Sequence, residues 1–97
     1  MPTYITLIRW TQQGIQNVKE SPVRLEAVKE LIRASGGEVK GFYMVMGRYD
    51  MVLITEAPDD AAVAKVLLAT ASKGAVSTET LRAFTEDEYR EIIGSLP

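Results

Sequence analysis

The segment Gly47-Arg48-Tyr49-Asp50 carries the side chains with the most evident capacity for chemistry. The Arg48 guanidinium can hold a carboxylate or another anion, the Tyr49 hydroxyl can donate a hydrogen bond, and the Asp50 carboxylate can orient either group. The same residues also suit a tight turn, in which glycine adopts an unusual dihedral angle and aspartate accepts backbone N–H groups. The sequence favours the turn interpretation and leaves the binding interpretation open.

Trp10 and Tyr43 form a second candidate set, because each is a large amphipathic side chain whose polar group needs a partner. Together with Thr80 they are placed to line an apolar pocket between a sheet and its helices, where small ligands often bind. Ordinary core aromatics show the same pattern, and core filling is the favoured interpretation. No catalytic residue is assigned, and the candidate ligand-binding residues are Trp10, Tyr43, Arg48, Tyr49, Asp50 and Thr80.

Composition excludes several classes of site. The chain has no histidine and no cysteine, which removes thiolate chemistry, the commonest general base and most zinc or haem ligands. The acidic runs Asp59-Asp60 and Glu86-Asp87-Glu88 both open expected helices, where carboxylates cap free N–H groups. We therefore expect no metal and no cofactor. A formal net charge of -2, with basic residues scattered among acids, argues against a nucleic-acid partner.

Length and hydropathy predict one domain, residues 1–97, in the cytoplasm. A chain of 97 residues can bury one core and has little left for a second. The mainly apolar run at residues 4–8 is too short for a signal-peptide core or a membrane span, so no membrane partner is expected.

The helices and strands that must position these candidates are predicted from the spacing of apolar residues and from capping, glycine and proline residues. A helix begins at Ser21-Pro22, with serine as the expected N-cap, and ends at Gly36-Gly37. Thr85 and Glu88 form a capping box that opens a last helix ending near Ile93. The expected strands are 3–10, 38–46, 50–57 and 75–83, and a further helix covers 60–73. This order, βαββαβ plus a C-terminal helix, predicts a ferredoxin-like α+β fold with a four-stranded antiparallel sheet.

Both faces of that sheet are apolar. Ile5 and Leu7 point one way while Tyr4, Ile8 and Trp10 point the other. A two-residue turn at Arg48-Tyr49 would pair Tyr43 with Ile54 on one face and leave Phe42, Met44, Met51 and Leu53 on the other. A different loop length shifts the pairing, but both faces remain apolar. Two helices hide one face only, so the second exposes roughly 600–800 Å² of apolar surface, more than monomers usually tolerate. We expect a homodimer through that face; the alternative is a terminal helix folded back over it.

Three segments together resemble the GYD-domain family. They are Gly47-Arg48-Tyr49-Asp50, Pro58-Asp59-Asp60 and residues 78–84, and the likeness extends over nearly the whole chain. That family is similar to the dimeric α/β barrels, so the resemblance implies the same fold and a dimer. Members of the wider superfamily include cofactor-free monooxygenases, haem-degrading enzymes, isomerases and ligand-sensing modules, so the resemblance implies no particular reaction.

Three functions remain as hypotheses. The first is an accessory or ligand-binding homodimer that takes a small apolar or aromatic molecule, with assembly into a higher oligomer left open. The second is a cofactor-independent monooxygenase or isomerase, in which Tyr43, Arg48, Tyr49 and Asp50 position the substrate and move protons. The third is a purely structural oligomerisation module.

Overall fold

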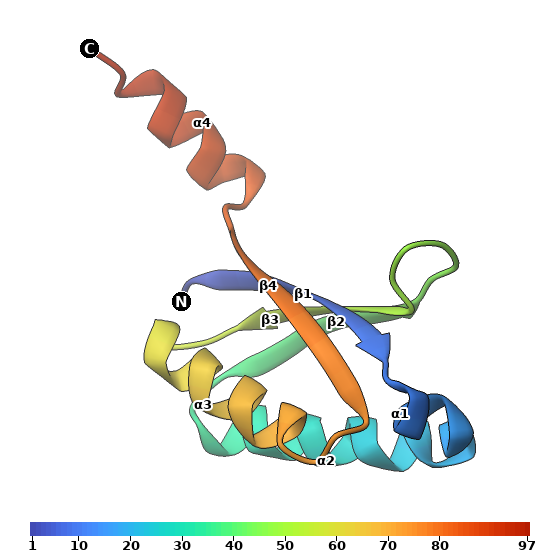
Figure 1. Cartoon of the computed structure of the whole chain (residues 1–97). Helices are drawn as coiled ribbons and strands as arrows, with labels where there is room; N and C mark the ends of the chain where they lie inside the picture. Colours follow the sequence, from blue (N-terminus) through green and yellow to red (C-terminus); the bar gives the residue numbers. More distant parts are fainter.

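The computed structural model describes all residues, 1–97, and shows the expected order of strands and helices (Figure 1). Four antiparallel strands form one sheet in the order β2-β3-β1-β4, so the first and third strands are central. This confirms the ferredoxin-like α+β plan. The elements are β1 (Thr3–Trp10), α1 (Gln12–Gln16), the 3-10 turn η1 (Val18–Glu20), α2 (Ser21–Ala34), β2 (Glu38–Met44), β3 (Met51–Glu56), α3 (Asp60–Ala71), β4 (Val76–Ala83) and α4 (Glu86–Gly94).

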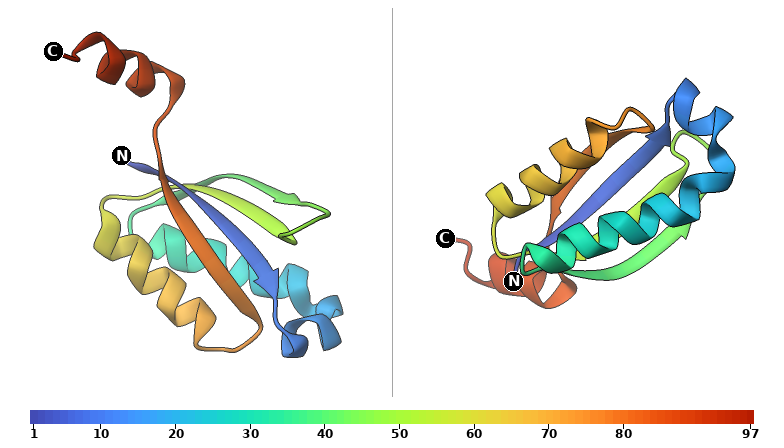
Figure 2. Two further views of the ribbon diagram at one scale, coloured as in Figure 1. Left: turned by 45° about the horizontal axis from the view of Figure 1, so that its top comes forward. Right: turned by 90° about the horizontal axis from the view of Figure 1, so that it is seen from below.

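The core lies between the sheet and the two helices α2 and α3, which cover the same face (Figure 2). Strand alternation sends every second side chain of β1 and β3 to this face. Ile32 from α2, Leu53 from β3 and Val66 from α3 meet there as buried residues. Because apolar side chains recur at helical spacing on α2 and α3, each helix presents one apolar stripe to the sheet.

The hairpin between β2 and β3 has a longer loop than expected. Strand β2 ends at Met44, and residues 45–50 form a loop closed by a hydrogen bond from Val45 N to Asp50 O at 2.9 Å. Tyr43 therefore pairs with Val52, and the predicted pairing with Ile54 is wrong. The shift is by two positions, and since side chains alternate with a period of two, each residue keeps its face.

The start of α2 also differs from the prediction. Ser21 lies inside the helix, because the 3-10 turn η1 leads directly into it, and Glu20 occupies the N-cap position. The Ser21 hydroxyl instead accepts a hydrogen bond from the Trp10 indole at 3.3 Å. Upstream, Gly14 permits a close approach, since a Cβ there would lie 1.9 Å from the Ala75 carbonyl oxygen.

The C-terminal helix α4 projects away from the sheet instead of folding back over it (Figures 1 and 2). Its capping box is formed as predicted, with Glu88 N donating to Thr85 Oγ1 and Thr85 N donating to Glu88 Oε1. The extents of 51 × 31 × 18 Å reflect this projecting arm. The sheet face opposite α2 and α3 is therefore left without a cover.

Candidate functional site

The 45–50 loop is anchored to the end of β1 by Asp50. Asp50 N donates to Ile8 O at 2.9 Å, and the Asp50 carboxylate accepts from Trp10 N at 3.0 Å. Gly47 has a φ of 135°, a left-handed conformation that residues with a side chain rarely adopt. The predicted unusual dihedral angle of Gly47 is confirmed. The prediction that Asp50 accepts turn N–H groups is wrong, because its carboxylate accepts from Trp10 on the neighbouring strand.

Arg9 and Glu79 surround Tyr49 at one end of the sheet. The Arg9 guanidinium lies 4.9 Å from the centre of the Tyr49 ring, and its Nε donates to Arg48 O at 2.7 Å. The Tyr49 hydroxyl donates to Glu79 Oε2 at 3.1 Å. Together with Arg48 these side chains line a hollow of about 340 Å³. With charges of both signs at its wall, the hollow suits a polar or charged group of a partner molecule.

Sequence reasoning did not single out Arg9 and Glu79. Both lie opposite the helices, where Arg9 continues the alternation of Ile5 and Leu7 along β1. Arg9 and Glu79 are diagonal neighbours on one face of the β1–β4 ladder, two positions apart, since Arg9 pairs with Ser77 and Leu7 with Glu79. The sequence signal that could have found Arg9 is its position, since it is the charged residue that follows Ile5 and Leu7 in the alternation along β1.

The other three candidates do not share a pocket. Trp10 lies half-buried on the helix side at the end of β1, bonded to Ser21. Thr80 lies on the same side, where its hydroxyl is 3.0 Å from that of Thr6. Tyr43 lies on the opposite side and is 61 % exposed. The expectation that these residues line one pocket between sheet and helices is wrong, because Tyr43 is on the other face of the sheet.

We use "open face" for the sheet surface opposite α2 and α3. Its centre is apolar, with half-buried aliphatic side chains on the central strands β1 and β3 and with Leu81, which is 47 % exposed, on β4. The hollow beside Tyr49 lies at its edge. The apolar residues of the open face are Ile5, Leu7, Tyr43, Val52, Ile54 and Leu81.

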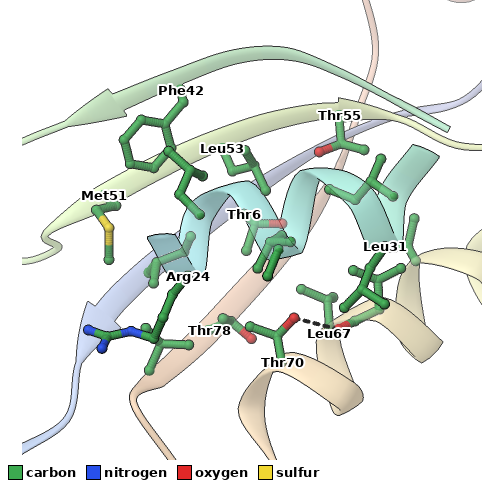
Figure 3. Close-up of a pocket in the computed structure, with 18 of the residues that line it drawn as sticks. Thr6, Arg24, Leu31, Phe42, Met51, Leu53, Thr55, Leu67, Thr70 and Thr78 are labelled. Atoms are coloured by element: carbon green, nitrogen blue, oxygen red, sulfur yellow. Dashed lines mark hydrogen bonds between the residues drawn. The ribbon is translucent and has the colours of Figure 1, made fainter. Parts of the chain in front are cut away.

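A second hollow, the interior cavity, lies between the sheet and the helices α2 and α3 (Figure 3). Its volume is about 120 Å³, and most of its wall is aliphatic. Leu31 and Leu67 line it from the helices, and Phe42 and Leu53 line it from the sheet. None of the six candidate residues lines this cavity.

Two ionisable groups have altered proton affinities. The Tyr4 hydroxyl donates to the Asp60 carboxylate, and this hydrogen bond, with burial, raises the pKa of Tyr4 above its usual value. The backbone N–H of Thr85 holds the pKa of Glu88 below its usual value. Both groups tie elements together: Tyr4 joins β1 to the first turn of α3, and Glu88 closes the first turn of α4.

The chain shows neither a cluster of metal-ligating side chains nor a helix that could span a membrane. No three histidine, cysteine, aspartate or glutamate side chains come close enough to hold a metal ion. None of the helices has the length and apolar character needed to cross a bilayer.

Comparison with known proteins identifies the family. The model of the GYD domain matches residues 4–93, which include the Gly47, Tyr49 and Asp50 of the loop described above. The chain belongs to the GYD domain family. One relative of this GYD domain is a Thermus thermophilus protein named glutamine synthetase and cystathionine beta-lyase binding protein. It is 43% identical over 84 residues, which cover 86% of this chain and 88% of the relative.

Solved structures support the GYD fold. A crystal structure of a Thermus thermophilus protein matches with a TM-score of 0.55 and 29% identity, over 88% of this chain and 95% of that one. A Pyrococcus horikoshii protein gives a TM-score of 0.55 at 25% identity, over 89% and 93%. A feast or famine regulatory protein of Mycobacterium tuberculosis, complexed with L-methionine, gives 0.63 at 21% identity, over 90% and 54%. At that identity the likeness to the regulator concerns the fold alone.

Proposed function

We propose that this GYD domain is a single-domain accessory protein of the cytoplasm that forms a homodimer and, as a dimer, binds metabolic enzymes. The uncovered open face of the sheet is the observation that carries the proposal. The Thermus thermophilus relative supports the class of partner, since its name states that it binds glutamine synthetase and cystathionine beta-lyase. The lack of cysteine is consistent with a reducing compartment.

A second copy of the chain is the occupant that best fits the open face. The apolar residues of the open face lie on all four strands, so the face has the breadth of the sheet on which a stable interface, which buries about 800 Å² per partner, can form. Its centre is aliphatic, while Arg9, Arg48 and Glu79 lie toward one end. This arrangement of an apolar centre with a polar rim is typical of protein interfaces. Because the rim holds both signs of charge, the face can be complementary to itself across a two-fold axis.

The position of α4 supports the same dimer. The helix leaves β4 on the side of the open face, away from α2 and α3 (Figure 1). Tyr89, Ile92 and Ile93 recur along it at helical spacing, Leu96 follows just after its end, and all four are between 44 and 63 % exposed. A copy seated on the open face lies beside this apolar stripe. We therefore propose that each α4 packs against the partner protomer.

Binding to the two named enzymes tests the proposed function. The full chain is immobilised in a biosensor. Purified glutamine synthetase and cystathionine beta-lyase, both from the organism that supplies this chain, are then passed over it. We expect at least one enzyme to bind with a Kd at or below about 1 μM, which corresponds to about 8 kcal/mol. An unrelated enzyme of similar charge serves as the control. If neither enzyme binds at tens of micromolar, the accessory role is wrong.

A further inference from the structure

The interior cavity is larger than the voids that protein cores usually contain. Cores pack at the density of organic crystals, and few of their voids exceed the size of a water molecule. The volume of about 120 Å³ here is comparable to that of an engineered apolar cavity, of roughly 150 Å³, that binds benzene. The wall of leucine, isoleucine, valine and phenylalanine side chains favours an apolar occupant.

One buried polar group in the wall has no hydrogen-bond partner within the protein. The Thr55 side chain lines the cavity from β3, is 5 % exposed, and has a hydroxyl with no hydrogen-bond partner. Figure 3 shows it on the helix side of the sheet, close to Leu53. Buried hydroxyls are almost always hydrogen-bonded, because leaving one unpaired destabilises the folded state.

Two other threonine hydroxyls in the wall of the cavity do have hydrogen-bond partners. The Thr70 hydroxyl donates to Val66 O at 2.8 Å, as the dashed line in Figure 3 marks. The Thr6 hydroxyl lies 3.0 Å from that of Thr80. Thr55 therefore has the buried hydroxyl of this wall that is left without a partner, and it can act as donor or acceptor toward a bound molecule.

The surroundings of Thr55 favour a neutral polar group beside its hydroxyl. Arg24 and Lys73 are the charged residues in its wall. The Arg24 guanidinium already donates to the carbonyls of Asn17 and Gly14, at 3.3 and 3.4 Å. A charge placed beside Thr55 would have aliphatic neighbours and no counter-ion, which is strongly unfavourable.

We propose that the interior cavity is a binding site for a small neutral molecule with an apolar body and one hydroxyl or carbonyl group. The apolar body occupies the space between α2, α3 and the sheet, and its polar group bonds with the Thr55 hydroxyl. The site is on the opposite side of the sheet from the proposed dimer surface, so it does not depend on the dimer or on enzyme binding.

The experiment compares p-cresol with toluene, which differ by the hydroxyl alone. Affinities of both probes for the full chain are measured by NMR chemical-shift titration of the cavity methyl groups. The quantity of interest is the ratio of the two affinities. In Thr55→Val we expect p-cresol to lose about two- to tenfold relative to toluene, the effect of one neutral hydrogen bond.

Thr70→Val is the matched control, because it removes a hydroxyl from the same wall that already has a protein partner. Its p-cresol to toluene ratio should equal that of the unaltered chain. Thr55→Ser, which keeps the hydroxyl, should retain the preference, and Val28→Phe, which fills the cavity, should weaken both probes. Thermal unfolding confirms that each variant is folded.

Three results would overturn the assignment. One is the failure of both probes to shift the cavity methyl groups at millimolar concentration. Another is an unchanged ratio in Thr55→Val, and the third is an equal loss in Thr70→Val. None of these results bears on the enzyme-binding role, which is measured without the probes.

Discussion

Asp50 connects two strands that are adjacent in the sheet but distant in the chain. Its backbone N–H extends the pairing with β1 by one bond, and its carboxylate accepts the next amide, that of Trp10. A charged acceptor contributes more than a neutral one to such a bond. The residue that ends the glycine-tyrosine-aspartate motif thus has a structural role that is sufficient to explain its presence.

We predict that Asp50→Ala lowers the free energy of unfolding by about 1.5–3 kcal/mol, because it leaves the Trp10 N–H without its charged partner. Asp50→Asn should cost less, since an amide oxygen can still accept. Thermal unfolding followed by circular dichroism, at one protein concentration, measures both. Equal stability of Asp50→Ala and the unaltered chain would show that the carboxylate is kept for binding rather than for the fold.

Tyr49 differs from Asp50 because its contacts are near the surface. Its ring lies under the Arg9 guanidinium and its hydroxyl reaches Glu79, which is exposed. Exposed pairs of this kind contribute little to stability. A residue that contributes little to the fold and borders a hollow is well placed to contact a partner, and this is why we keep Arg48 and Tyr49 as binding candidates.

At the scale of elements, α4 is a helix that is stabilised mainly by the capping hydrogen bonds of its first turn. The Thr85 side chain and the Glu88 side chain each satisfy a backbone N–H of the other residue. Helix α4 projects from the rest of the fold (Figure 1) and its apolar side chains are exposed, so tertiary packing supports it little. Isolated helices of this length are marginal in water, and capping is therefore decisive for it.

The lowered pKa of Glu88 sets the pH dependence of α4. The folded-state pKa lies below the ordinary value of 4.5, so the stabilisation is present above that value. It is lost as the pH falls through the lower, folded-state pKa. We predict that Thr85→Ala, which removes the side-chain cap on Glu88 N, loosens the first turn and reduces the helix content of α4. Because the loosened turn no longer holds the N–H of residue 85 against the Glu88 carboxylate, the pKa of Glu88 should rise toward 4.5, whereas Thr85→Ser preserves both.

Carboxyl carbon shifts in an NMR pH titration report the Glu88 pKa, and backbone shifts report the helix. A Glu88 pKa that is the same in Thr85→Ala as in the unaltered chain would contradict the capping account.

At the scale of the whole molecule, one sheet has two apolar faces and one helical cover. Burying apolar surface is the dominant favourable term in association, and the open face is the side of the sheet that the fold leaves uncovered. The proposed dimer follows from this imbalance. It does not require any particular residue of the glycine-tyrosine-aspartate loop.

Two aspartate substitutions on the same face of β4 test the dimer. Leu81→Asp places a charge in the apolar centre, and Ser77→Asp places one at the exposed edge. We predict that the unaltered chain has twice its 10.7 kDa mass by light scattering. Leu81→Asp should raise the dimer dissociation constant by roughly a hundredfold or more, because a buried charge without a partner is costly.

Ser77→Asp should leave the dissociation constant within a few-fold of the unaltered value. A chain that ends after Thr85 should also dimerise more weakly, since it lacks the α4 stripe. A chain that remains at 10.7 kDa up to millimolar concentration would show that the open face does not pair with a second copy.

Sequence alone determined the order of elements, the capping of α4, the left-handed glycine at position 47 and the two apolar faces of the sheet. These depend on local signals: alternation along Ile5 and Leu7, helical spacing on α2, and the Thr85–Glu88 capping box. Only the tertiary structure decided the β2–β3 register, the grouping of Arg9 and Glu79 with Tyr49, and the isolation of the Thr55 hydroxyl in the interior cavity. Loop length, strand pairing and helix packing join residues far apart in the chain, and no local pattern records which hydroxyl those contacts leave without a partner.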